Sequence, residues 1–371
     1  MAKLGEVCLL KAGKFVSAND ISPEYNKGLY PCFGGNGIRG YVADYTHDGE
    51  FPLIGRQGAL CGNVNLASGK FHATEHAVVV QPKIEMNVHW LYYAINAMNL
   101  GQYATGAAQP GLAVSKLETL SIEIPNISEQ NKIAQTLYKV EQLVNFRKQQ
   151  LAKLDELVKA RFVEMFGEPI NNPMKWIVSK IEDIAAQEKN ALKAGPFGSA
   201  LKKEFYVKSG YKIYGQEQVI CGDASFGDYY IDEEKYKELK NCAVQAGDIL
   251  ISLVGTYGKA LIMPDNYEAG IINPRLMKIT LNKNKVKPIY FKYYFESDAL
   301  KASMDANTHG GTMGILNLGI IRQMKIQVPP LSLQNQFAAF VERVDQQKQT
   351  VQQSLEKLEL MKKALMQEYF G

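Results

Sequence analysis

LAVSKLETLSIEIPNISEQNKIAQTLYKVEQLV, residues 112–144, occurs twice in this chain, the second time as LNLGIIRQMKIQVPPLSLQNQFAAFVERVDQQK at residues 316–348. A constant offset of 204 residues aligns 112–167 with 316–371 without a gap, and 18 of the 56 paired residues are identical. Shared helical composition would not produce all of these identities, which include Pro125/Pro329, Ser128/Ser332, Gln130/Gln334, Asn131/Asn335 and a closing Phe-Gly dipeptide in each copy. The chain therefore contains an internal duplication.

Each copy continues into a long predicted helix whose apolar residues recur at alternating steps of four and three. Such a spacing of 3.5 residues, kept over several heptads, is typical of a coiled-coil seam. Eight of the ten positions in each series are apolar, counting tyrosine. The two series are Ile133, Leu137, Val140, Val144, Arg147, Leu151, Leu154, Val158, Arg161, Met165 and Phe337, Val341, Val344, Lys348, Val351, Leu355, Leu358, Lys362, Leu365, Tyr369.

The ends of these helices carry recognisable signals. Pro125 and Pro329 lie just before them, where a missing N–H does least harm. Ser128 and Ser332 are the expected N-caps, and Gly167 is expected to end the first helix in a left-handed conformation.

Connectivity favours pairing of the two helices over the alternative, in which each helix packs only on its own domain. The short loop 168–175 (EPINNPMK) separates the first helix from the second domain. The second helix must start near that domain, so it pairs with the first most simply by running back antiparallel. Roughly 35 helical residues at ~1.5 Å each would separate the two domains by a distance on the order of 50 Å.

The remaining segments read as mostly β bodies. Short β-branched runs such as HAVVVQP (76–82) and GDILISLVG (247–255) alternate with Gly and Pro turns, with short helices expected at 88–98 and 288–304. The predicted fold class is α+β, with two mixed, mostly β domains separated by an antiparallel two-helix coiled coil as a pseudo-twofold internal repeat. The predicted boundaries are 1–125 and 168–328 for the domains, and 126–167 and 329–371 for the helices.

Composition sets broad limits on function. The 371 residues are 46% hydrophobic and 22% charged, with 42 basic against 38 acidic residues and a net charge of +4. This mild excess is compatible with nucleic-acid binding without establishing it. Five cysteines without a C-x-x-C motif favour a reduced, cytoplasmic setting, and neither a signal peptide nor a membrane-spanning segment is expected.

The glycine-rich stretch YPCFGGNGIRG (30–40) contains both F-x-G-x-G and G-x-G-x-x-G. A dinucleotide fingerprint needs a helix directly after it, and the following YVADYTHDGEFP does not read as one. An adenine methyltransferase would also need a [DNS]-P-P-[YFW] loop, which the sequence lacks. We therefore interpret the stretch as a turn between two strands, with Gly and Asn at positive φ. HATEH (72–76) is a weak zinc signal, because it lies in strand-like sequence.

The repeated helices, P-x-x-S-x-x-N at the start of each, Phe-Gly at their ends and AGPFGSALKKEFY (194–206) together resemble the specificity subunits of type I restriction–modification systems. The resemblance covers the whole chain. It implies that each domain is a target-recognition domain for one half of a bipartite, asymmetric DNA site. It further implies that the helices set the spacer and dock two methyltransferase subunits, which methylate adenine, and that restriction/translocase subunits then join the assembly.

The same resemblance assigns catalysis to the partners. S-adenosylmethionine, ATP and magnesium would be bound by those subunits, and this chain would be non-catalytic, with no cofactor or metal of its own. Two alternatives from other classes are a protein-interaction scaffold and a stand-alone methyltransferase or nuclease. The second would need catalytic motifs that the sequence lacks.

Candidate DNA contacts are side chains able to bind base edges or phosphates from loops. For each one, a solvated loop residue is the competing interpretation. The candidates are Asn36, Arg39, Arg56, Gln57 and Gln109 in the first domain, and Lys202, Lys203, Tyr257, Lys259, Arg275 and His309 in the second.

Two further sets lie on the helices. Arg147, Arg161, Lys348 and Lys362 interrupt the seam and are candidates for setting helix register. Leu143, Leu157 and Phe162 lie off the seam, and they either dock the methyltransferase or pack on their own domain.

Overall fold

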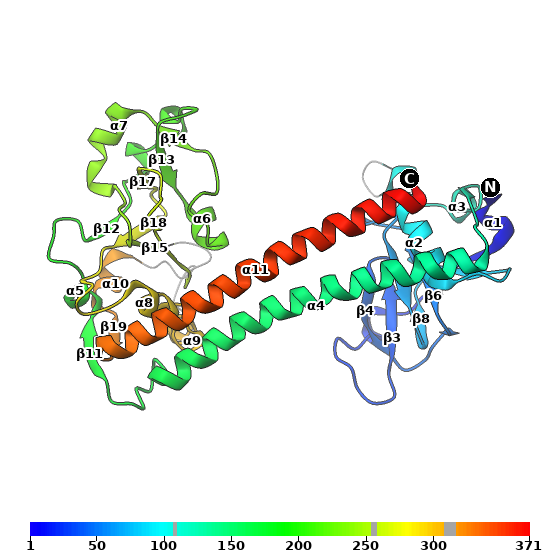
Figure 1. The fold of residues 1–371 in the computed structure, drawn as a ribbon, viewed down its shortest axis with the longest axis horizontal. Coiled ribbons are helices and arrows are strands. Elements are labelled where there is room, and N and C mark those ends of the chain that lie inside the picture. Colours follow the sequence, from blue (N-terminus) through cyan, green and yellow to red (C-terminus); the bar gives the residue numbers. More distant parts are fainter. Residues whose placement is uncertain (107–109, 254–257, 308–316) are drawn as a thin grey trace. The chain divides into compact units, whose positions relative to one another are not determined.

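The computed structural model describes residues 1–106, 110–253, 258–307 and 317–371. It divides into two compact units, the first formed by Met1–Gln149 with Val351–Gly371 and the second by Gln150–Thr350. Both chain termini belong to the first unit (Figure 1). Each unit contains part of α4 (Ile127–Phe166) and part of α11 (Leu331–Phe370).

The first unit is built on two four-stranded sheets. One is entirely antiparallel, in the order β2-β9-β6-β7, with bounds Cys8–Ala12, Ala77–Pro82, Phe51–Gly55 and Val64–Ala67. The other has the order β4-β3-β8-β5, with bounds Gly37–Val42, Tyr30–Gly34, Lys70–Ala73 and His47–Asp48. Its β3 and β8 are parallel, which requires a long crossover between them.

Short elements complete this unit. Its hydrophobic core joins the antiparallel sheet to α2, whose Trp90, Leu91 and Ile95 are buried. The remaining elements are β1 (Ala2–Lys3) paired with β10 (Ser121–Ile122), the helices α1 (Leu4–Val7), α2 (Val88–Ala97) and α3 (Val114–Glu118), and the 3-10 turns η1 (Ala18–Asp20) and η2 (Leu100–Tyr103).

The second unit repeats the antiparallel sheet and three of the four strands of the other sheet. Its antiparallel sheet has the order β12-β18-β15-β16, with bounds Leu192–Ala194, Leu276–Ile279, Ile249–Ser252 and Ala260–Ile262. Its other sheet has the order β14-β13-β17, with bounds Tyr230–Ile231, Tyr211–Tyr214 and Gly270–Ile272, and again its central strand β13 has one parallel neighbour, β17. The duplication seen in the helices therefore extends through both β bodies.

The small elements of the second unit follow the same plan. The pair β11 (Ile177–Lys180) and β19 (Lys325–Val328) corresponds to β1 and β10. The sequence predicted one helix over 288–304, but two are present, α8 and α9. The helices are α5 (Ile181–Ile184), α6 (Gln216–Cys221), α7 (Glu233–Glu238), α8 (Pro288–Phe295), α9 (Asp298–Asn307) and α10 (Leu318–Gln323), with 3-10 turns η3 (Gly198–Ala200), η4 (Lys203–Phe205) and η5 (Lys240–Cys242).

Within each unit, α4 and α11 pack in opposite directions. In the first unit, Arg147 Nε donates to Ser354 Oγ at 3.2 Å, and Lys362 Nζ lies 2.7 Å from Glu141 Oε1. In the second unit Lys348 pairs with Asp155. The seam positions that are less than a tenth exposed are Ile133, Leu137, Val140, Val144, Val158, Phe337, Val341, Val344, Val351 and Leu355. The charged residues at three of the seam interruptions thus bond across to the other helix.

A buried glutamine near the start of each long helix fixes it to the preceding body. Gln130 Oε1 accepts from the Asn87 N–H at 2.9 Å, and Gln334 Oε1 accepts from the Lys287 N–H at 2.8 Å. The Nε2 of each donates to the carbonyl of Pro125 or Pro329, at 2.8 Å in both units. This explains physically why the repeat retains the Pro-x-x-x-x-Gln spacing.

The predicted helix ends are partly right. Gly167 has φ +78° and its N–H donates to the Val163 carbonyl at 2.8 Å, so the left-handed cap is confirmed. The predicted N-caps are wrong, because Ser128 and Ser332 lie inside the first turns. Asn126 Oδ1 accepts from the Glu129 N–H instead, and the Pro330 carbonyl opens α11.

Among the described residues, no helix is both long and apolar enough to cross a membrane. The five cysteines are free thiols, and four of them are buried.

Candidate nucleic-acid interface

The glycine-rich stretch of the first unit is the turn between β3 and β4, as predicted. Gly34 pairs with Gly37 across it, and Gly37 has φ +98°. The expected positive φ at Asn36 is wrong, since Asn36 is not among the described non-glycine residues with positive φ. A Cβ on Gly55, at the end of β6, would overlap the Gly35 carbonyl, so glycine there lets the turn cross the end of the antiparallel sheet.

This crossing gathers the four described DNA candidates of the first unit. Asn36 is exposed in the turn, and its Oδ1 accepts from Asn63 Nδ2 at 2.7 Å. Arg39 is exposed on β4, with its side chain 3.8 Å from a Cβ built on Gly34. Arg56 and Gln57 follow β6 directly, the first half-buried and the second exposed. The fifth candidate, Gln109, lies outside the described residues.

The loop between β8 and β9, which contains none of the predicted DNA-contacting residues, also lies beside this cluster. The Arg56 N–H donates to the His76 carbonyl at 3.0 Å, which places the loop between β8 and β9 beside the end of β6. His76 Nε2 lies 3.2 Å from Glu75 Oε1, and the His76 side chain is 39% exposed. His72, the other histidine of the weak zinc signal, is 8% exposed, with its Nε2 3.2 Å from the Lys14 carbonyl oxygen.

The corresponding strand ends of the second unit carry a bonded polar trio. Arg275 is exposed just before β18, and its Nη1 donates to Gln216 Oε1 at 3.3 Å. Gln216 Nε2 in turn donates to Ser252 Oγ, at the end of β15, at 2.8 Å. The sequence predicted Arg275 but missed Gln216, because the long-range pairing that brings them together leaves no local signal.

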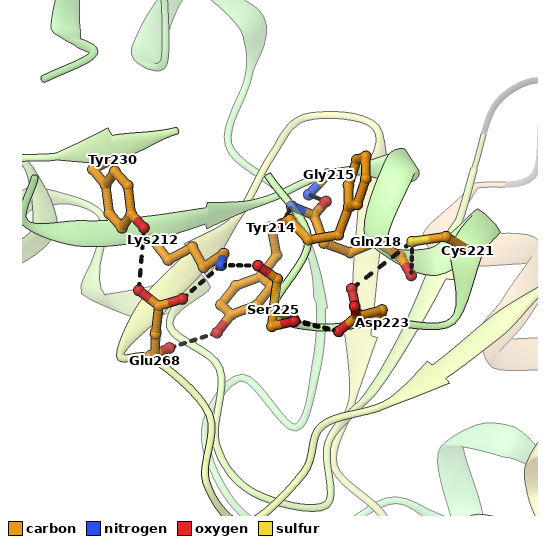
Figure 2. Close-up of polar contacts among 10 residues, drawn as sticks. Lys212, Tyr214, Gly215, Gln218, Cys221, Asp223, Ser225, Tyr230 and Glu268 are labelled. Carbon is orange, nitrogen blue, oxygen red and sulfur yellow. Dashed lines mark hydrogen bonds and ion pairs between the residues drawn. The ribbon is translucent and has the colours of Figure 1, made fainter. Parts of the chain in front are cut away.

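A dense polar network surrounds α6, the helix that begins at Gln216 (Figure 2). The side chain of Gln218, 1% exposed, accepts from the Gly215 N–H and donates to the Phe226 carbonyl, both at 2.8 Å. Lys212 Nζ, also buried, bonds to the Ser225 carbonyl and to Glu268 Oε1 at 2.8 and 2.6 Å. Gln216 directly follows Gly215, whose N–H is held by this network.

The same network shifts the pKa values of two side chains, Asp223 and Tyr214. The Ser225 hydroxyl and N–H both donate to Asp223 Oδ1 and lower the pKa of that carboxyl. Burial, followed by the nearby Glu268 carboxylate, raises the pKa of Tyr214, whose hydroxyl donates to the Glu268 carbonyl at 2.6 Å. Both groups therefore keep their ordinary charge at neutral pH, with Asp223 ionised and Tyr214 neutral.

The other candidates of the second unit are more scattered. Lys202 and Lys203 are exposed around η4, where Lys202 Nζ lies 3.5 Å from Glu204 Oε1. Lys259 lines a separate cavity of about 160 Å³ with Lys159 of α4, Asp298 of α9 and Glu296, which directly follows α8. No described contact joins these lysines to Arg275. Tyr257 and His309 lie outside the described residues.

The helix surface predicted for docking is reduced by one residue. Leu143 and Leu157 are 46% and 47% exposed on α4. Phe162 is only 3% exposed, because its ring packs against Phe166, Tyr290 and Phe337 in the core of the second unit. Phe162 is therefore not exposed for docking, and it packs in the second unit rather than on the domain that precedes its helix.

Fold and site together define a duplicated protein of mixed α and β structure, with an exposed polar cluster at the strand ends of each copy. The type I restriction modification DNA specificity domain matches this chain over residues 1–156 and 173–360. The chain therefore belongs to the family of type I restriction–modification DNA specificity proteins.

Relatives in sequence carry the same description. The type I restriction enzyme EcoprrI specificity subunit of Escherichia coli is 52% identical over 143 residues, which are 38% of this chain and 36% of that subunit. A putative type I restriction enzyme specificity subunit of Haemophilus influenzae is 26% identical over 335 residues, 86% of this chain and 80% of that one. The chain thus spans about a third of the first relative and most of the second.

Two solved structures share the fold. The S subunit of a type I restriction–modification system from M. genitalium has a TM-score of 0.63 at 17% identity, covering 100% of this chain and 95% of that one. A chain from a study of complex assembly and conformational transition of the type I restriction–modification system has a TM-score of 0.58 at 14% identity, covering 100% and 96%.

Proposed function

We propose that each unit reads one half of a bipartite, asymmetric DNA site. The observation that carries this proposal is the repeated two-sheet frame, which presents different polar side chains at equivalent strand ends. Arg, Gln and Asn are the side chains that pair best with base edges in the major groove. Because the two exposed sets differ, their half-sites should differ as well.

The paired helices are proposed to act as the spacer between the two reading surfaces. Each is a continuous helix of 40 residues, which corresponds to a length of about 60 Å. DNA repeats every ~34–36 Å, so two readers joined by such helices would contact patches more than one turn apart. The antiparallel coiled coil and its pseudo-twofold arrangement are part of this proposal.

Exposed apolar residues on α4 support docking of methyltransferase subunits along the helices. In addition to Leu143 and Leu157, Tyr138 and Phe146 are 45% and 58% exposed. Methylation of adenine would then be performed by those subunits with S-adenosylmethionine. Restriction/translocase subunits would bring ATP and magnesium, and the assembly would act in the cytoplasm, where duplex DNA is present.

DNA binding by the chain together with its methyltransferase partner tests this function. We expect specific binding whose affinity falls as a power of salt concentration, because phosphate contacts release counterions. The double variant Arg39→Ala/Arg56→Ala should still form the complex with the methyltransferase partner. It should bind DNA less tightly, and its affinity should depend less steeply on salt concentration. Salt-independent protein binding without DNA binding would support the scaffold alternative instead.

Methyl transfer tests the non-catalytic assignment. The purified chain alone should transfer no tritiated methyl groups to duplex DNA, whereas the chain with its methyltransferase partner should transfer them. Clear incorporation by the chain alone would identify a self-contained methyltransferase and overturn the assignment.

A further inference from the structure

Backbone hydrogen bonds align the reading loops of the two units residue by residue. In the first unit, the Thr74 N–H donates to the Phe33 carbonyl at 2.9 Å, and in the second the Asn273 N–H donates to the Tyr214 carbonyl at 2.9 Å. The loop between β8 and β9 therefore corresponds to the turn between β17 and β18, which the internal sequence repeat does not reveal.

A second pair of bonds fixes the register within these loops. The Arg56 N–H donates to the His76 carbonyl at 3.0 Å, and the Leu253 N–H donates to the Arg275 carbonyl at 2.9 Å. Each acceptor residue directly precedes the strand that pairs with the donor's strand, β9 or β18. His76 and Arg275 therefore occupy the same position in the two units.

Both side chains at this position can donate to base acceptors. Arg275 is exposed and its guanidinium is bonded to Gln216, whereas His76 is 39% exposed and paired with Glu75. Guanine presents N7 and O6 in the major groove and adenine presents N7, all of which accept hydrogen bonds. The two units thus place different donors on the same backbone frame.

The surroundings of His76 have unused hydrogen-bonding capacity. Arg56 Nε, Glu75 Oε2 and His76 Nδ1 are buried atoms without a hydrogen-bond partner among the described residues. Because an unpaired buried polar atom is costly, a polar ligand that bonds to this cluster gains additional free energy. A base edge with both donors and acceptors matches such a mixed cluster.

We infer that His76 is a specificity-determining residue of the first unit, at the position that Arg275 occupies in the second. The inference rests on the proposed function. Each of these side chains reads a base in its own half-site, so exchanging one changes one half of the recognition sequence and leaves the other half unchanged.

The test is the methylation pattern of DNA from cells that produce the full chain with its methyltransferase partner. His76→Ala should relax base preference at one position of one half-site, by about 5- to 150-fold. Arg275→Ala should do the same in the other half. His76→Arg should instead create a preference for guanine at the position that His76→Ala relaxes.

Lys27→Ala and Lys208→Ala are the matched controls. Both lysines are exposed before the central strands β3 and β13, at the opposite end from Gly34 and Gly215, and neither variant should change the motif. In each variant, an unchanged preference in the other half-site shows that the other unit and the assembled complex remain functional. If His76→Ala supports no methylation, His76→Arg decides the question in its place.

Two results would overturn the inference. One is a wild-type motif that His76→Ala and His76→Arg both leave unchanged, and the other is a change in the same half-site from His76 and Arg275 variants. The absence of any bipartite motif in the wild type would instead overturn the proposed function, and the inference with it.

Discussion

The two units share the same arrangement of strands and differ in the exposed residues at the strand ends. Both have a central strand with one parallel neighbour, an antiparallel four-stranded sheet and a buried glutamine at the start of a long helix. At the strand ends, however, Gly35 and His76 of the first unit stand where the second has Gln216 and Arg275. Buried positions thus preserve the scaffold while exposed positions are free to change.

The units also differ where the long helices meet the bodies. Phe162 and Phe337 form an aromatic cluster with Phe166 and Tyr290 in the second unit. At the offset of 204 residues, the first unit has Ile133 and Met366 in the places of Phe337 and Phe162. The packing of the long helices on the body is therefore more aromatic in the second unit. This difference can be measured as a difference in the free energy of unfolding.

The largest expected effect comes from opening this aromatic cluster. Phe162→Ala should destabilise the second unit by about 3–5 kcal/mol, because a buried ring leaves a cavity. Met366→Ala, its half-buried counterpart, should cost the first unit about 2 kcal/mol or less. Hydrogen exchange of each unit would measure both values, with the exposed Val163→Ala as the control. Equal losses of stability in the two units would contradict the expected difference between the two sets of helix contacts.

The next largest effect concerns the buried glutamine that both units have near the start of a long helix. Gln334→Leu would leave the Lys287 N–H and the Pro329 carbonyl without their present partner, at a cost of about 2–3 kcal/mol. Gln130→Leu should cost the first unit a similar amount for the same reason. The exposed Gln349→Leu is the control, and denaturant unfolding is the measurement. A negligible cost in either unit would show that the glutamine does not anchor the helix there.

Charged seam residues should have smaller effects. Lys348→Met and Lys362→Met should each change stability by less than about 1 kcal/mol, since partly exposed ion pairs contribute little. Lys362 should show the larger loss, because its partner Glu141 is less exposed than Asp155. A double-mutant cycle with Glu141→Gln isolates the pair, and a coupling that persists in high salt would contradict its assignment as a screened ion pair.

The smallest expected effect is a pH dependence of stability in the first unit. Burial, then His72, Lys11 and Lys14, lowers the pKa of His47 in the first unit. The unfolded state therefore binds the proton more readily, so stability present above about pH 6.5 should decline as the pH falls below it. His47→Phe should flatten this dependence in the first unit, measured by thermal unfolding between pH 5 and 8. A decline of the same size in the variant would assign the effect to other groups.

Sequence reasoning identified the features that depend on local pattern. The duplication, the two long helices, the Gly167 cap and the glycine turn could all be predicted from neighbouring residues. The first N-cap is not decided by local pattern, because Asn126 and Ser128 are both good capping residues and only the packing of the first turn selects between them.

The site was harder to predict because it depends on contacts between distant segments. Gln216 and His76 reach their positions only through the pairing of β13 with β17 and of β6 with β9. Because Phe162 lies off the seam of its own helix, the sequence leaves docking and packing on its own domain as equal alternatives for it. The rings that bury it come from α8 and α11, which a single helical pattern does not reveal.

Insertion of one heptad into each long helix tests the central claim most directly. Seven residues placed between Gln149 and Gln150, and seven more between Thr350 and Val351, would lengthen the pair by ~10 Å, or roughly three base pairs. The account predicts a methylation motif with both half-sites unchanged and a spacer about three base pairs longer. An unchanged spacer, or altered half-sites at the old spacing, would contradict it.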